Sequence, residues 1–255
     1  MRPDDARVRT PRAADLGLHA GPALHDHPIW WKHADLMRAC QLGAALLHPD
    51  DTARARRRTR RAQSESLAAR ALLRALVCDT WGTWWARARL AHAVGGAPFL
   101  PDRPDCSISL SHSGDQVAVA LSTTADVGID IQWMDPHLKL EPVIRRCFHP
   151  REIEAMEHLA KQERQALFYA WWVAKEAVVK CLRKGLAQST ASFVVPHPLG
   201  CGPVLGLDTQ MWVTALPAPT GYRAALAWQD RRPSRGHTDT ECSSKSVTSS
   251  NQEAL

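Results

Sequence analysis

One stretch of alternating residues places a carboxylate on the open face of a predicted strand. Residues 127–131 alternate between apolar and small or polar side chains, which is typical of a strand with one face in the core. The two-residue period of a strand puts Gly128, Asp130 and Gln132 on the opposite face. There the carboxylate stands beside a glycine that leaves room for a ligand. An ordinary half-exposed strand with a solvated aspartate explains the same pattern.

A predicted helix carries an acid and a base on one face. Glu176 and Lys180 are four residues apart, and Trp172 lies one turn earlier on the same side. The three side chains therefore form a second candidate group for chemistry. A surface ion pair worth about 0.3 to 0.5 kcal/mol explains the spacing equally well.

A histidine with neighbouring hydroxyls lies between two predicted strands. Ser111, His112 and Ser113 precede a glycine and an aspartate, which are good turn residues, and can donate hydrogen bonds to a phosphate. A structural or solvated histidine is the plainer interpretation. The sequence has no acidic partner spaced for a Ser-His-Asp triad, no GxxxxGK[ST] loop and no GxGxxG after a strand.

The densest positive charge in the chain is the run ARARRRTRR at residues 53–61. Such a run can neutralise several phosphates, which raises nucleic-acid binding as a competing hypothesis. The run has no interleaved aromatic residues and matches no helix-turn-helix, zinc-finger or RNP pattern.

The elements that must position these residues follow from hydrophobic periodicity. Apolar spacing predicts helices over residues 53–81 and 162–182, the second ending near Lys184 and Gly185 because glycine suits a left-handed cap. Strands are expected over residues 107–111, 117–121, 127–131, 192–195, 211–216 and 222–228. The order helix, strands, helix, strands predicts an α+β fold of two similar halves that meet near residue 125.

Length and composition set the remaining expectations. The chain has 255 residues, 45% of them hydrophobic, and a net charge of +6, which favours an anionic partner. Its seven scattered cysteines include no CxxC pair. Without a membrane-spanning run or secretory signal, we expect a cytoplasmic protein. We expect a flexible segment (1–25), two subdomains (26–125 and 126–230) and a disordered polar tail (231–255).

Three blocks together resemble the Sfp-type 4'-phosphopantetheinyl transferases. They are SLSHSG at residues 109–114, VGIDIQ at 127–132, and WVAKEAVVK at 172–180 followed by RKGL. With RRCFHPREIE at residues 145–154, the resemblance covers roughly residues 35 to 230. It implies a pseudo-twofold pair of α+β halves with coenzyme A in the cleft between them, and a fused pair of halves favours a monomer.

The resemblance also implies a magnesium site and a base. Asp130 and Glu176 would hold Mg²⁺, with Gln132 as a third, uncharged donor, and the metal would grip the pyrophosphate of coenzyme A. Glu176 would take the proton of a serine on an apo acyl or peptidyl carrier protein as that serine attacks the β-phosphate. The products would be the phosphopantetheinylated carrier and 3',5'-adenosine diphosphate.

The same resemblance assigns the cationic and hydroxyl groups to phosphates. Lys180 and His112 would neutralise phosphate oxygens of coenzyme A, with Ser111 beside them and Lys184 as a further candidate. The arginine run, including Arg57 and Arg61, matches the region that binds the 3'-phosphate.

Three departures from the family pattern support a second hypothesis. Gln132 stands where an acidic residue is usual, Ala97 replaces the lysine of a GKP motif, and Glu65 falls where an arginine is common. A catalytically degenerate protein that binds coenzyme A or a carrier is therefore the runner-up to the transferase, and nucleic-acid binding is third. The sequence does not name the carrier or its pathway.

Overall fold

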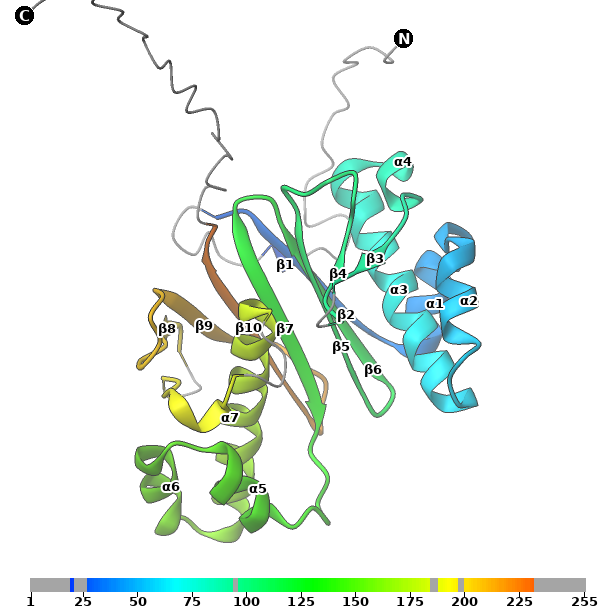
Figure 1. Cartoon of the computed structure of the whole chain (residues 1–255). Helices are drawn as coiled ribbons and strands as arrows, with labels where there is room; N and C mark the ends of the chain where they lie inside the picture. Colours follow the sequence, from blue (N-terminus) through cyan, green and yellow to red (C-terminus); the bar gives the residue numbers. More distant parts are fainter. Residues whose placement is uncertain (1–18, 21–26, 94–95, 184–187, 197–199, 232–255) are drawn as a thin grey trace, which may run out of the picture.

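The fold consists of two four-stranded antiparallel sheets, each covered by helices (Figure 1). The computed structural model describes residues 19–20, 27–93, 96–183, 188–196 and 200–231. The predicted α+β class with two α+β halves is confirmed. Most of the predicted N-terminal segment and the tail beyond Arg231 lie outside the described residues.

The first half has strand order β1-β2-β6-β5 and a separate pair β3-β4. Its strands are β1 (His19–Ala20), β2 (Ile29–Asp35), β3 (Ala91–His92), β4 (Pro98–Phe99), β5 (Ser107–Ser113) and β6 (Gln116–Ser122). Its helices are α1 (Leu36–Gly43), the 3₁₀ turn η2 (Ala44–Leu46), α2 (Pro49–Ala55), α3 (Arg60–Trp81) and α4 (Thr83–Ala86). In Figure 1 the helices gather on the side of this sheet that faces away from the second half.

The single helix predicted over residues 53–81 is wrong, because the chain forms two helices there. α2 ends at Ala55, and α3 begins only at Arg60, with Thr59 as its N-cap. Like charges on successive turns oppose a continuous helix, and the break lies within the arginine run. The predicted apolar face of α3 is nevertheless buried, including Leu72 and Leu76.

The second half has strand order β7-β10-β9-β8. Its strands are β7 (Ala125–Trp133), β8 (Gly202–Pro203), β9 (Met211–Leu216) and β10 (Tyr222–Asp230). Its helices are α5 (Leu140–Cys147), α6 (Pro150–Glu157), α7 (Lys161–Leu182) and the 3₁₀ turn η4 (Thr190–Ser192). The strands predicted over residues 211–216 and 222–228 correspond to β9 and β10.

The strand predicted over residues 192–195 is wrong. The segment forms η4 and then a single bridge between Val194 and Leu205. The fully buried ammonium of Lys175 accounts for this geometry, because it donates to the carbonyl oxygens of Thr190 and Phe193 at 2.8 and 2.7 Å. A carbonyl held this way does not continue a strand ladder.

The two sheets pack face to face between the helical layers. In β6, Val117, Val119 and Leu121 pack with α3, while the small side chains of Ala118 and Ala120 face the second sheet. This alternation follows from the two-residue period of a strand. The layers are therefore helices, sheet, sheet and α7, with one apolar core at each of the three boundaries.

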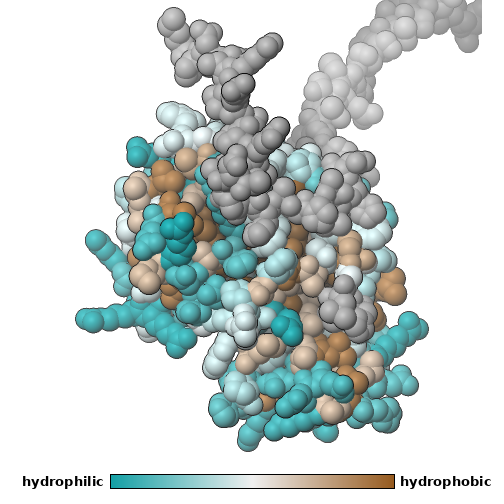
Figure 2. Space-filling model, turned by 180° about the vertical axis from the view of Figure 1, so that it is seen from behind, coloured by the Kyte–Doolittle hydropathy of each residue, from teal (hydrophilic) through white to brown (hydrophobic). Residues whose placement is uncertain are grey.

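The surface is mostly hydrophilic on the face seen from behind in Figure 2, where apolar residues form smaller groups between polar ones. Among the described residues, none of the helices combines the length and apolar character needed to span a bilayer.

Candidate active site

Four serine hydroxyls join the two halves along a seam between β5 and β7. Their oxygens accept hydrogen bonds from backbone N–H groups of β7 in pairs offset by twenty residues, so the strands run parallel. The pairs are Ser107 with Val127 (3.0 Å), Ser109 with Ile129 (3.0 Å), Ser111 with Ile131 (3.3 Å) and Ser113 with Trp133 (3.0 Å). Where the two halves meet, hydrogen bonds from the β7 backbone to serine side chains thus take the place of backbone-to-backbone hydrogen bonds between β5 and β7.

Asp130 lies at the middle of this seam and is only 2% exposed. Its Oδ1 accepts hydrogen bonds from the hydroxyl of Ser111 at 2.6 Å and from Nζ of Lys180 at 2.7 Å. Its Oδ2 is buried and has no hydrogen-bond partner among the residues that the structure describes. Because an unpaired buried carboxylate oxygen is costly, this atom indicates a place for an additional cation or donor.

The expectation that Asp130 stands on a half-exposed face beside an open glycine is wrong. Asp130, Gly128 and Gln132 do share one face, but α7 covers it. A Cβ on Gly128 would lie 2.0 Å from the carbonyl oxygen of Ala177. Glycine is therefore required for close packing of strand and helix, and it leaves no room for a ligand.

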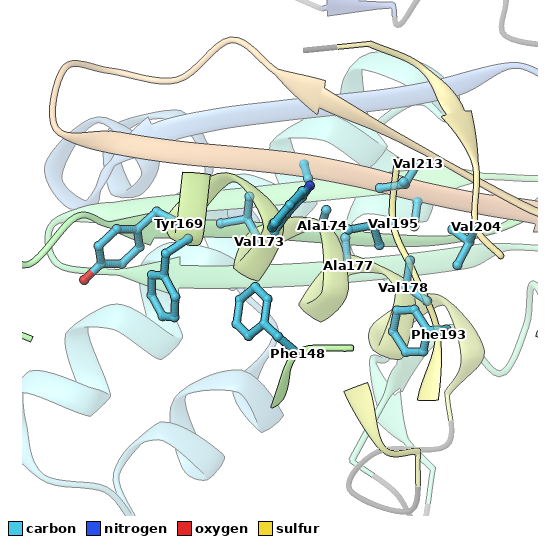
Figure 3. Close-up of a cluster of buried hydrophobic side chains, with 14 of the residues drawn as sticks. Phe148, Tyr169, Val173, Ala174, Ala177, Val178, Phe193, Val195, Val204 and Val213 are labelled. Atoms are coloured by element: carbon cyan, nitrogen blue, oxygen red, sulfur yellow. The ribbon is translucent and has the colours of Figure 1, made fainter. Parts of the chain in front are cut away.

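Glu176 on α7 is half-buried, between the buried residues Lys175 and Ala177. Ala174, Ala177 and Val178 belong to the apolar cluster around α7 shown in Figure 3. Glu176 itself lines a cavity of about 920 Å³. Burial raises the pKa of this carboxyl, the negative charge of Asp130 raises it further, and Lys180 opposes both effects.

Lys180 bonds to Asp130 rather than pairing with Glu176 as the helix spacing suggested. Besides Oδ1 of Asp130, Nζ donates to the carbonyl oxygen of Ile129 at 3.1 Å. The side chain is 29% exposed. The ammonium therefore links α7 to β7 and keeps partial access to solvent.

His112 lies at the end of β5 and not in the turn, which consists of Gly114 and Asp115. The strand continues to Ser113, because the hydroxyl of Ser113 still bonds to β7. Nδ1 of His112 is 3.5 Å from Oε2 of Glu65 on α3. Burial lowers the pKa of the imidazole, Glu65 opposes this, and Lys180 and then Arg58 add to the lowering.

Gln132 lies two residues beyond Asp130 on the same edge. Its Oε1 accepts a hydrogen bond from the hydroxyl of Ser113 at 3.1 Å. Ser113 and Gln132 both line the large cavity with Glu176. Ser111 and Ser113 therefore make the same kind of contact, one to the carboxylate and the other to the amide.

The two arginines predicted to bind phosphate lie in different elements. Arg57 is exposed in the turn between α2 and α3. Arg61 lies in the first turn of α3, and its Nε donates to Oε1 of Glu65 at 3.1 Å. Arg58, rather than Arg57, is close enough to His112 to lower its pKa. Lys184, the remaining candidate, lies outside the described residues.

Arg183 occupies the end of α7 that was expected to lead into a glycine cap. Its backbone is left-handed, with φ of 54°. Its guanidinium donates to the hydroxyl of Ser107 at 2.8 Å and lies 3.8 Å from Asp126. The predicted cap residue, Gly185, is outside the described residues.

A second cavity, of about 210 Å³, lies on the Lys180 side of the seam. Its walls come from both halves: residues 96–98 and 108–110 from the first, and Val179, Lys180 and Arg183 from the second. Two cations thus face this smaller cavity, whereas Glu176 faces the larger one. Lys180, which bonds to Asp130, lines the smaller cavity.

The available donors suit a hard cation that retains several water molecules. They are the Oδ2 atom of Asp130, the carboxylate of Glu176 and the amide oxygen of Gln132. Within the described ranges, no three or more His, Cys, Asp and Glu side chains cluster in a way that could hold a metal. The role of Gln132 as a third, uncharged donor stays a prediction.

Sequence reasoning missed Arg58 and Arg183 as members of this region, and it predicted neither the contact between Glu65 and His112 nor the bonds of the serines to β7. The serines could have been found, because hydroxyls recur at every second residue from Ser107 to Ser113. The position of Arg58 depends on the break between α2 and α3, which periodicity did not reveal.

The fold and site define an α+β protein of two halves with an acidic and cationic seam between them. Residues 126–216 match the sequence model of the 4'-phosphopantetheinyl transferase superfamily. The chain is similar to "4'-phosphopantetheinyl transferase HetI" of Nostoc sp., with 32% identity over 57% of this chain and 63% of that protein. It is also similar to "4'-phosphopantetheinyl transferase Sfp" of Bacillus subtilis, with 36% identity over 39% of this chain and 43% of that protein. These matches confirm the resemblance predicted from the sequence.

The matched part of the chain spans no more than about three fifths of the first two curated relatives. A solved structure, the holo-[acyl-carrier-protein] synthase of Thermotoga maritima, aligns with 42% of this chain and 64% of that chain at 18% identity. Its TM-score is 0.35, too low to bear on fold or function.

Proposed function

We propose that this protein transfers the 4'-phosphopantetheine arm of coenzyme A to a serine of an apo acyl or peptidyl carrier protein, with Mg²⁺ as cofactor. The observation that carries the proposal is Asp130, a buried carboxylate at the seam with one oxygen that has no partner among the described residues. A cation is the partner that such an oxygen lacks, and Glu176 and Gln132 provide further oxygen donors on the side of the large cavity.

Glu176 is the general base of the proposed reaction. Burial and the charge of Asp130 raise the pKa of its carboxyl, which makes the carboxylate a better proton acceptor than an ordinary glutamate. It accepts the proton of the carrier serine as the serine oxygen forms a bond to the β-phosphorus of coenzyme A. The bond between that phosphorus and the bridging oxygen breaks, and 3',5'-adenosine diphosphate leaves.

Lys180 and His112 stabilise the leaving group. Negative charge moves onto the departing phosphate during the transfer, and fixed cations beside it lower the barrier. Lys180 is held by Asp130 and by the carbonyl of Ile129, so it is oriented before substrate arrives. His112 accepts a proton more readily once an anion lies against it. When bound, Mg²⁺ neutralises charge on the pyrophosphate.

The two cavities fit the two substrates. The small cavity with Lys180 and Arg183 suits the nucleotide end of coenzyme A, and the nearby arginine run suits its 3'-phosphate. The large cavity with Glu176 suits the reacting serine and the pantetheine arm, because its walls include Phe168 and Trp172.

Intact mass spectrometry of an apo acyl carrier protein tests this function. The carrier is incubated with the protein, coenzyme A and Mg²⁺, with a chelated reaction as control. We expect the carrier to gain the mass of one phosphopantetheine arm, and chelation to prevent the gain. Unchanged mass with acyl, polyketide and peptidyl carriers would contradict the proposal.

A second function is favoured by the amide at Gln132. A protein with only two carboxylates at the seam would hold Mg²⁺ more weakly and could bind coenzyme A or a carrier without turnover. Coenzyme A binding by calorimetry, without any gain in carrier mass, would identify this degenerate binder. Steeply salt-dependent binding of duplex DNA without coenzyme A binding would instead support the nucleic-acid hypothesis.

A further inference from the structure

Glu65 is a carboxylate in a region otherwise rich in cations. It projects from α3 toward the end of β5, and its side chain is only 12% exposed. The neighbouring carboxylate on α2, Asp51, already pairs with Arg74 at 2.6 Å and with Arg70 at 3.5 Å. Among the described residues, the ion pairs of Glu65 are with His112 and Arg61, and the buried Arg70 and Arg74 pair with Asp51 instead.

The two partners of Glu65 compensate its charge weakly. The side chain of Arg61 is 79% exposed, and an ion pair with an exposed arginine contributes little. The pKa of His112 is lowered, and Nδ1 lies 3.5 Å away, beyond a good hydrogen bond. Burying a carboxylate beside such partners costs free energy, so a role in packing alone does not account for it.

We propose that Glu65 is an internal counter-ion of the phosphate site, which pairs with His112 and Arg61 before substrate binds and sets the affinity for phosphate-bearing substrates. This inference rests on the proposed function, because it takes His112 and the arginine run as contacts of coenzyme A. An incoming anion must replace Glu65 beside His112 or bind next to its negative charge. Either way, Glu65 reduces affinity most for the substrate with the most negative charge.

The selectivity between coenzyme A and its 3'-dephospho form follows from this position. Glu65 lies between His112, which faces the proposed pyrophosphate site, and Arg61, in the proposed 3'-phosphate region. The extra phosphate of coenzyme A adds negative charge on the Arg61 side. Glu65 should therefore reduce the ratio between the affinity for coenzyme A and the affinity for 3'-dephospho-coenzyme A.

Calorimetry with both ligands, at low salt and without a carrier, tests this inference. We expect Glu65→Gln to bind coenzyme A about tenfold more tightly than wild type, with a smaller gain for 3'-dephospho-coenzyme A. Glu65→Ala should behave like Glu65→Gln, because both remove the charge, whereas a packing role would separate them. Glu141→Gln is the matched control, since Glu141 pairs with Arg164 at 2.8 Å on another helix.

Several results would overturn the role of Glu65. These are unchanged or weaker binding of coenzyme A by Glu65→Gln, an equal gain for both ligands, or an equal gain in Glu141→Gln, which would indicate a general charge effect. If wild type and variants all fail to bind coenzyme A, the proposed function is wrong. In that case the binding of inorganic pyrophosphate, measured by calorimetry, tests the role of Glu65 separately. Tighter binding of pyrophosphate by Glu65→Gln than by wild type would support the counter-ion, and unchanged binding would overturn it.

Discussion

The two halves bring different kinds of side chain to their common seam. The second half contributes Asp130, Glu176 and Lys180 from a strand and a helix that touch backbone to backbone at Gly128. The first half contributes His112 from a strand end and arginines from the ends of α2 and α3, most of them exposed. The carboxylates of the second half therefore lie on tightly packed elements, whereas the arginines of the first half are mostly exposed. Under the proposed function, the second half supplies the base and the carboxylates for the metal, and the first half supplies His112 and exposed arginines that contact phosphate.

The largest expected effect of any substitution is on the acidic group. Asp130→Asn and Glu176→Gln keep the size of each side chain but remove its charge, so each should lower the rate of carrier modification about a thousandfold. Both proteins should unfold at temperatures close to wild type. Retained activity in either variant, measured by carrier mass over time, would remove that residue from the proposed mechanism.

The contact between strand and helix can be broken at Gly128. Because an added Cβ would lie 2.0 Å from the oxygen of Ala177, Gly128→Ala should lower the free energy of unfolding by about 3 kcal/mol. Gly200→Ala is the control, since no atom of the described residues lies within 4 Å of the place that its Cβ would take. Denaturant unfolding measures both. Equal stability of the two variants would show that α7 moves away from β7 easily.

A substitution at Gln132 should increase the affinity of the second half for Mg²⁺. Gln132→Glu places a third carboxylate near Asp130 and Glu176, and we expect Mg²⁺ to bind about tenfold more tightly. Gln188→Glu adds a carboxylate elsewhere on the same cavity wall and should have little effect. Calorimetric titration with Mg²⁺ distinguishes the two variants. A similar gain in both would mean that only the net charge of the cavity matters.

The smallest effects are expected in the basic group of the first half. Arg57→Gln and Arg61→Gln should each raise the KM for coenzyme A by about twofold to fivefold and leave kcat unchanged, because exposed charges contribute little individually. The difference from wild type should shrink at high salt. A large fall in kcat would contradict the division of roles between the halves.

Short-range patterns predicted which faces of β7 and α7 the proposed site residues occupy better than they predicted what packs against those faces. The period of two placed Gly128, Asp130 and Gln132 on one face of β7, and the period of 3.6 placed Glu176 away from the buried stripe of α7. Neither period reveals that α7 lies on top of Asp130, because that contact joins elements 50 residues apart in sequence. The burial of Asp130 and its bond to Lys180 therefore required the structure.

The first half was harder to predict because its site residues lie at element ends. The break between α2 and α3 brings Arg58, rather than the predicted Arg57, close enough to His112 to lower its pKa. The continuation of β5 through His112 depends on the Ser113 hydroxyl, which bonds across the seam to Trp133. Such ends are decided by tertiary hydrogen bonds rather than by local propensity.

The most direct test of the central claim is the Mg²⁺ dependence of coenzyme A binding in wild type and Asp130→Asn. If the seam holds Mg²⁺ and pyrophosphate together, calorimetry should show that Mg²⁺ strengthens coenzyme A binding to wild type by about tenfold or more and leaves binding to Asp130→Asn unchanged. Equal strengthening in both proteins, or none in wild type, would contradict the account.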